Sequence, residues 1–156
     1  MQTAIKSYKM RQVITGLVLF ILTASCNNKV QQALSKEFID AGPNFSKAVS
    51  IRTGNVKTIY VTGLTGEGAD FELQTRSTFE NIRVVLEKAG AGLKDIVKTN
   101  IYIPNYTPAN MDIFREIRKE ILGGKDMPAS TVIGVSVLAA KDKLMEIEAV
   151  AVVQLN

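Results

Sequence analysis

Two glutamates near the end of the chain have the residue type and spacing for acid–base chemistry. Glu146 and Glu148 stand in the run Leu144–Val153, whose β-branched residues predict a strand. Alternate side chains of a strand point to opposite faces, so both carboxylates share one face with Leu144, Val150 and Val152. The opposite face is wholly apolar. Carboxylates on a mostly apolar face are costly unless that face meets a polar cavity or a partner.

A second run of β-branched residues precedes this strand. Residues 127–138 read Met-Pro-Ala-Ser-Thr-Val-Ile-Gly-Val-Ser-Val-Leu, and Lys141-Asp142-Lys143 separates the two runs. We expect two strands, with Ser130, Gly134 and Ser136 on the face that carries the glutamates.

The residue types that are absent limit the kinds of catalytic and metal site that the chain can form. The chain has no histidine, which excludes Ser-His and Cys-His pairs and imidazole metal sites. Its sole cysteine, Cys26, can form neither an internal disulfide nor a metal cluster. We therefore expect no metal and no cofactor, and acid–base work falls to Glu, Asp, Lys, Tyr or water.

The N-terminal segment is typical of an export signal. Basic residues up to Arg11 precede the apolar run Val13–Leu22, and Thr-Ala-Ser leads into Cys26. This pattern resembles a lipoprotein signal with Cys26 as the lipidated residue, which would anchor an exported, periplasmic or cell-envelope protein to a membrane. A plain secretory signal or an uncleaved anchor, with Cys26 incidental, is the alternative. The predicted organisation is a signal peptide over 1–25, a polar tether over 26–38 and a folded domain over 39–156.

Charge gives no support for a nucleic-acid partner. Of the 19 basic residues, three lie in the signal segment, which has no acids, so the remainder carries 16 basic and 15 acidic residues. No basic stripe with interleaved aromatics is present, and we expect no nucleic-acid binding.

The rest of the chain predicts an α+β domain. Strands are expected at 45–52 and 56–62, followed by the glycine-rich loop 63–68, which is no phosphate-binding motif. A helix follows over 71–89, then a strand over 96–103. A second helix begins at Thr107-Pro108, a capping residue followed by proline at the first helical position, and ends at Gly123-Gly124. The order is ββαβαββ, a mixed sheet with two helices on one face.

Two helices cover only one face of such a sheet. The other face would combine the glutamates with apolar residues such as Val150 and Val152. An uncovered face of this kind favours a partner, and a homo-oligomer is the simplest one.

The motifs of these strands resemble a known family. Pro-Ala-Ser-Thr-Val-Ile-Gly-Val-Ser followed by Glu-Ile-Glu-Ala-x-Ala-Val is similar to the C-terminal signature of the RidA/YjgF family, and the likeness runs from about Ala41 to Val153. The resemblance implies a homotrimer whose sheets join into a central barrel. It also implies a small-molecule ligand in the clefts between subunits, and hydrolytic deamination of 2-imino or enamine acids.

The resemblance also implies roles for individual residues. Glu146 matches the glutamate that positions or activates the hydrolytic water, and Thr62-Gly63 matches a pair whose backbone lies near the ligand. Asn110 matches an asparagine at the cleft. Ser130 occupies the position of the arginine that grips the substrate carboxylate through a bidentate fork. Losing such a pair, worth about 1.5–3 kcal/mol, should weaken binding by about one to two decades.

Simpler interpretations stand beside these roles. Glu148 is expected to bind water or donors from a neighbouring subunit, and Glu146 has either a cleft role or a structural one. Asn110 serves either the ligand or its own helix. Lys47, Arg52 and Lys141 are candidates to replace the missing cation, and the sequence alone does not place them.

Three functions follow from these alternatives. The first is a 2-imino acid deaminase, weakened by Ser130. The second is a non-catalytic trimer that binds a different small molecule, and the third is an envelope scaffold protein.

Overall fold

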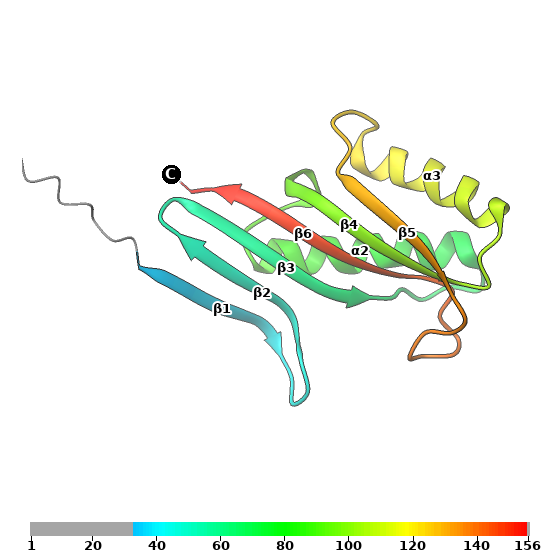
Figure 1. Ribbon diagram of the computed structural model, residues 1–156, viewed down its shortest axis with the longest axis horizontal. Helices are drawn as coiled ribbons and strands as arrows, with labels where there is room; N and C mark the ends of the chain where they lie inside the picture. Colours follow the sequence, from blue (N-terminus) through cyan, green and yellow to red (C-terminus); the bar gives the residue numbers. More distant parts are fainter. Residues whose placement is uncertain (1–32, 156) are drawn as a thin grey trace, which may run out of the picture. The chain divides into compact units, whose positions relative to one another are not determined.

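Six strands form one sheet across the part of the chain that the computed structural model describes, residues 33–155 (Figure 1). The predicted signal peptide, Cys26 and most of the predicted tether lie outside the described residues. The strands are β1 Leu34–Ala41, β2 Ser46–Thr53, β3 Val56–Leu64, β4 Ile96–Pro104, β5 Ala129–Val135 and β6 Glu146–Gln154. The helices are α2 Phe71–Lys88, the short 3-10 helix η1 Leu93–Asp95, and α3 Pro108–Leu122.

The strand order is β1-β2-β3-β6-β4-β5, which places the glutamate-bearing strand at the centre. β6 pairs antiparallel with both β3 and β4. β4 and β5 are parallel, and α3 provides the crossover that a parallel pair requires. The α+β class and the two-helix arrangement are confirmed.

The sequence prediction missed the first strand. β1 begins at Leu34, inside the predicted tether, and pairs with β2 from Leu34↔Thr53 to Ala41↔Ser46. The folded domain therefore starts before residue 39, and the order is βββαβαββ. The strand was hidden because it lies at the sheet edge, where only Ile39 of its eight residues is buried, and its apolar and polar residues do not alternate.

The helices begin where the sequence indicated. The Asp70 side chain accepts a hydrogen bond from the Leu73 amide at the start of α2. Thr107 accepts from the Asn110 amide at the start of α3, with Pro108 in the first turn. α3 ends at Gly123, whose φ of 81° is left-handed and favours glycine. No helix within residues 33–155 is long and apolar enough to cross a membrane.

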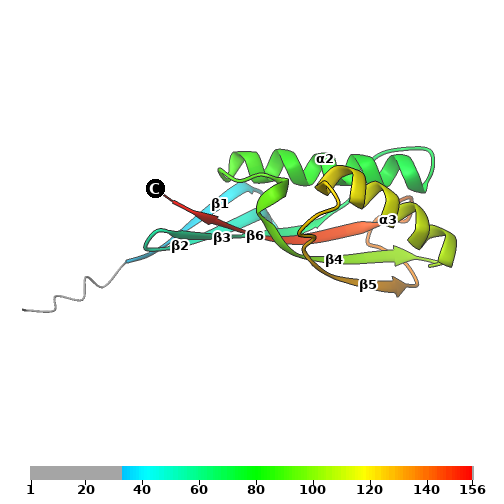
Figure 2. The same cartoon turned by 90° about the horizontal axis from the view of Figure 1, so that it is seen from above.

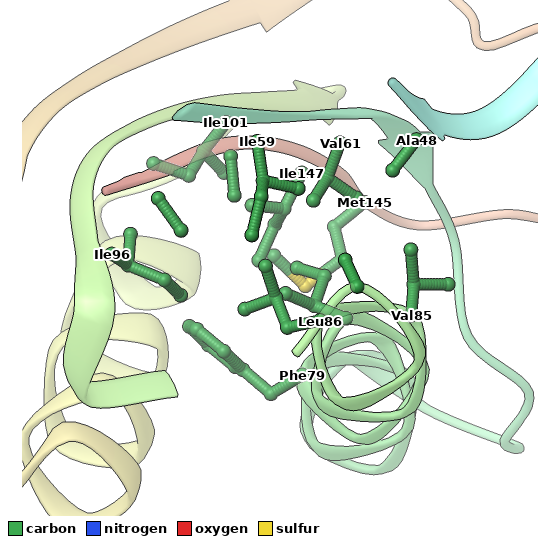
Figure 3. Close-up of a cluster of buried hydrophobic side chains, with 14 of the residues drawn as sticks. Ala48, Ile59, Val61, Phe79, Val85, Leu86, Ile96, Ile101, Met145 and Ile147 are labelled. Atoms are coloured by element: carbon green, nitrogen blue, oxygen red, sulfur yellow. The ribbon is translucent and has the colours of Figure 1, made fainter. Parts of the chain in front are cut away.

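Both helices pack on the same face of the sheet (Figure 2). Met145, Ile147, Ala149 and Ala151 are all buried there, as the alternation along β6 predicted. Phe79 of α2 and Ile59, Val61 and Ile101 of the sheet meet them in the core, which Figure 3 shows. The face away from the helices, called the open face below, carries Glu146 and Glu148.

The prediction for β5 was wrong in one respect. Ser130 lies opposite Thr99, which is buried beneath the helices, and the Thr99 hydroxyl donates to the Ser130 hydroxyl at 3.3 Å. Ser130 and Gly134 therefore lie on the helix side, and Ser136 follows the strand's end. The cause is register: β5 pairs with β4 and not with β6, so residue types alone could not fix which alternate set joins the glutamates.

Candidate functional site

Glu146 lies at the beginning of β6, against the backbone of Gly63. Its neighbours Met145 and Ile147 are buried beneath the helices, which directs Glu146 to the open face, where it is half-buried. The register of β3 against β6 shifts between Val61 and Leu64, and this bulge brings Gly63 beneath the carboxylate. A Cβ on Gly63 would lie 1.8 Å from Glu146 Oε1, so the close approach requires glycine.

The Glu146 carboxylate is electrostatically disfavoured in its ionised form. Burial raises its pKa above the ordinary value, and the negative charge of Glu148 raises it further. Within residues 33–155, no side chain donates a hydrogen bond to it. A carboxylate with a raised pKa and unused acceptor sites can take a proton from water.

Glu148 lies on the same face of β6 as Glu146 but has a different environment. Its Oε2 accepts a hydrogen bond from the Tyr102 hydroxyl at 3.0 Å and another from Asn100 Nδ2 at 3.2 Å. The bond to Glu148 raises the pKa of Tyr102, which keeps that phenol protonated. Glu148 also lines an open-face groove of ≈ 320 Å³ with Tyr60 and Lys98. These contacts indicate a structural role for Glu148 within one subunit.

A cavity opens beside Gly63 between the sheet and α2. β2 pairs with β3 only as far as Ala48↔Val61, whereas β3 continues to Leu64. The strands separate there and leave a space of ≈ 310 Å³, at the lower end of the range for small-molecule pockets, about 300–1,000 Å³. Its lining residues are Phe45, Lys47, Gly63, Leu64, Thr65, Asn81, Val84 and Val85.

Gly63 connects this cavity with the glutamate. It lines the cavity and also lies against the Glu146 side chain. Thr62, also predicted at the site, is half-buried in the same bulge. The structure therefore places Gly63 against Glu146, with Thr62 next to Gly63 in the bulge.

Ser130 and Asn110 do not join this group within one subunit. Ser130 lies on the helix side of β5, whereas Glu146 lies on the open face. Asn110 Oδ1 accepts from the Thr107 amide at 2.9 Å and from the Thr107 hydroxyl at 2.6 Å. The interpretation of Asn110 as a residue that secures its own helix is the one that these bonds favour.

Sequence reasoning missed three parts of the cavity wall. Phe45 was assigned only to a strand, and Asn81 and Val84 only to a helix. Asn81 Nδ2 donates to the Thr65 carbonyl at 2.9 Å and so ties the glycine-rich loop to α2. The local sequence contains no signal for Asn81, because an exposed polar residue beside a core residue such as Ile82 is usual on an amphipathic helix.

Within the described chain, no group of three His, Cys, Asp or Glu residues could hold a metal ion. The groups that the described residues present around Gly63 include the Glu146 carboxylate, the Lys47 ammonium and the Asn81 amide.

Known proteins resemble this chain in sequence and in fold. A model of the family described as Endoribonuclease L-PSP matches residues 35–153. A RutC family protein from Pyrococcus abyssi is 38% identical over 111 residues, which cover 65% of this chain and 82% of that protein. A 2-iminobutanoate/2-iminopropanoate deaminase from Dermatophagoides farinae is 31% identical over 123 residues, covering 72% of this chain and 88% of that protein.

The fold matches as well. The crystal structure of a YjgF/YER057c/UK114 family member from Mycobacterium tuberculosis has a TM-score of 0.66 at 33% identity, covering 76% of this chain and all of that one. The family match spans most of the chain, and the sequence and structural relatives agree with it. The chain belongs to the RidA/YjgF family, the Endoribonuclease L-PSP family of the matched model.

Proposed function

We propose that this protein hydrolyses 2-imino acids, and their enamine tautomers, to 2-oxo acids and ammonia, with Glu146 as the catalytic residue. The observation that carries the proposal is the Glu146 carboxylate, which has a raised pKa and lies against Gly63, a residue that lines a small-molecule cavity. The named activity of the Dermatophagoides farinae relative supports the choice of reaction.

The reaction needs one base and one water molecule. Glu146 accepts a proton from water while the water oxygen bonds to the imine carbon, and the protonated Glu146 passes this proton to the nitrogen to give a neutral carbinolamine. The hydroxyl proton of the carbinolamine then moves through Glu146 to the amino group, the carbon–nitrogen bond breaks, and ammonia leaves as the carbon–oxygen double bond of the 2-oxo acid forms. Water is consumed, ammonia is released and Glu146 returns to its starting state. A positioned base of this kind contributes about 10²–10⁴ to the rate.

Ser130 lowers the expected rate. A short neutral hydroxyl replaces the arginine that the resemblance implies for the substrate carboxylate, and it cannot form a bidentate pair. We therefore expect slow turnover compared with relatives that carry the arginine.

The proposed active form is a homotrimer with clefts between subunits. Large apolar side chains are exposed on the open face, among them Phe38, Tyr60, Ile133 and Val152, which are 38–61% exposed. Apolar side chains spread over a sheet face favour burial against another copy of the chain. An inter-subunit cleft would also allow Ser130 of one subunit to approach Glu146 of another.

The test compares three forms of the full chain with 2-iminobutanoate generated in situ by an amino-acid oxidase. The extra rate of 2-oxobutanoate formation is recorded for the parent, Glu146→Ala and Ser130→Arg. The proposal expects slow acceleration by the parent, none by Glu146→Ala and a gain in Ser130→Arg. A parent that matches the enzyme-free rate contradicts it.

A non-catalytic trimer is the second candidate, either a binding protein for another small molecule or an envelope scaffold. Ser130 favours it because it removes the carboxylate grip. The predicted signal over 1–25 favours it as well, since imines made by cytosolic enzymes do not arise outside the cytoplasmic membrane. We propose export and lipidation at Cys26 on the same basis. If Cys26→Ser leaves the protein in the membrane fraction, the lipid anchor is wrong.

A further inference from the structure

The cavity beside Gly63 has the composition of a site for a small anion with an apolar body. Four of its eight lining residues are apolar or aromatic: Phe45, Leu64, Val84 and Val85. Among the described residues that line the cavity, Lys47 is the one with a charge, and its acidic neighbour Asp40 is not part of the lining. A single cation against an apolar wall favours a ligand with one negative group.

The Lys47 ammonium is available for such a ligand. Its neighbour Asp40 is already held by Lys88, whose Nζ lies 2.7 and 3.0 Å from the two Asp40 carboxylate oxygens. Lys47 Nζ forms only a long ion pair with Asp40, at 3.8 Å and beyond hydrogen-bond distance, and its side chain is 52% exposed. Lys88 is also the first cause of the lowered pKa of Asp40, and the charge of Lys47 is the last.

The position of Lys47 relates it to Glu146 through Gly63. Lys47 precedes Ala48, where β2 and β3 cease to pair, and Ala48 and Val85 lie at one end of the core (Figure 3). Lys47 and Gly63 line the same cavity, and Gly63 lies against Glu146. A ligand in the cavity would thus meet both the Lys47 cation and the backbone of Gly63, which Glu146 contacts.

The other candidate cations do not line this cavity. Arg52 Nε donates to the Gly54 carbonyl in the β2–β3 turn, at the opposite end of β2. Lys141 is exposed in the segment between β5 and β6.

We propose that Lys47 binds the carboxylate of the ligand and so takes the place of the arginine that is absent at position 130. The choice of ligand, a small 2-oxo or 2-imino acid, rests on the proposed function. An ammonium is a point charge without a planar fork, so it attracts the carboxylate but orients it less strictly than arginine would. The site should accordingly accept small carboxylates of several shapes.

The test measures binding without turnover. Dissociation constants for 2-oxobutanoate and its neutral analogue 2-oxobutanamide are determined by calorimetry on the full chain and three variants. We expect Lys47→Met to weaken the binding of 2-oxobutanoate by about two- to fivefold, the effect of one partly exposed ion pair, and to leave the binding of 2-oxobutanamide unchanged. Lys47→Arg should bind 2-oxobutanoate like the parent, and the matched control Lys141→Met should do the same.

Three results would overturn the inference: a parent that does not bind 2-oxobutanoate, an unchanged affinity in Lys47→Met, or an equal loss for both ligands. If Lys47→Met does not fold, as judged by its urea midpoint, Lys47→Gln replaces it with the same expectations. Because the readout is binding, the two proposals can fail separately. If the protein has no turnover but its affinity for 2-oxobutanoate depends on Lys47, the deaminase proposal is wrong and the Lys47 site stands. If the protein has turnover and Lys47→Met leaves it unchanged, the Lys47 site is wrong and the deaminase proposal stands.

Discussion

Glu146 and Glu148 are the same residue type on the same face of one strand, yet their surroundings give them opposite properties. Glu148 lies opposite Asn100 and accepts hydrogen bonds from Asn100 and Tyr102. Glu146 lies opposite Tyr102, but the Tyr102 hydroxyl is directed to Glu148. Glu146 instead lies over the bulge at Gly63, where the absent side chain leaves room for a carboxylate and supplies no donor.

The comparison teaches that alternation along a strand fixes the face, whereas the neighbouring strands fix the chemistry. Hydrogen bonds to a carboxylate favour its ionised form and occupy its lone pairs. Burial without such bonds disfavours ionisation and leaves the lone pairs for water. We therefore assign acid–base catalysis to Glu146, the first residue of β6, and a structural role to Glu148, two residues further along the strand.

The largest expected effect separates the two glutamates by activity. Glu146→Gln removes the base and should lower the rate of 2-oxobutanoate formation about 10²-fold or more. Glu148→Gln keeps an acceptor for Tyr102 and Asn100 and should change that rate less than about threefold, since it leaves the base in place. Equal losses of rate in the two variants would show that Glu146 and Glu148 do not differ in their catalytic role.

A second comparison tests the role of Gly63. Gly63→Ala introduces a Cβ at 1.8 Å from Glu146 Oε1, which must displace the carboxylate. A displaced base should cost about tenfold or more in rate, because proton transfer requires hydrogen-bond contact. Gly92→Ala is the matched control, as its nearest atom would lie 3.9 Å away, an ordinary contact. Parent-like activity in Gly63→Ala would show that Glu146 need not occupy its present place.

Much of the fold could be predicted because each element carries local signals. The helices have an acid or threonine cap and a glycine end, and the apolar set of β6 alternates without a break. β1 had no comparable signal, since an edge strand with one buried residue resembles a polar linker.

The face of Glu146 could be predicted because it depends on the alternation along one strand. The features that depend on pairing between strands could not be predicted from the residues alone. Gly63 was named only through the family resemblance, and its contact with Glu146 depends on the bulge between β3 and β6. The face of Ser130 depends on the β4–β5 register, and the cavity at Lys47 depends on where β2 leaves β3. Neither feature can be recognised from the local sequence.

Stability should distinguish the glutamates in a third way. Glu148→Ala leaves the Tyr102 hydroxyl and the Asn100 amide without their acceptor and should lower the free energy of unfolding by about 1–2 kcal/mol. Glu146→Ala removes a carboxylate whose ionised form the fold disfavours at pH 7, so it should leave the free energy of unfolding unchanged or raise it. Urea unfolding at pH 7 measures both. A greater loss in Glu146→Ala would mean that Glu146 has a structural role.

The smallest expected effect is a shift in pH dependence. Glu146 must be ionised to act as a base, so activity should fall as the pH drops through its raised pKa. The negative charge of Glu148 is the second cause of that raised pKa, after burial, and Glu148→Gln removes it. The pKa of Glu146 then falls, and the acid limb of the pH–rate profile should move to lower pH.

Burial remains in the variant, so the limb should still lie above the pH expected for a solvent-exposed glutamate. Added salt should shrink the difference between parent and variant, because the removed interaction is a charge–charge repulsion at a half-buried site. A limb that moves to higher pH would mean that Glu148 lowers the pKa of Glu146, and that the two carboxylates share a proton instead of repelling each other.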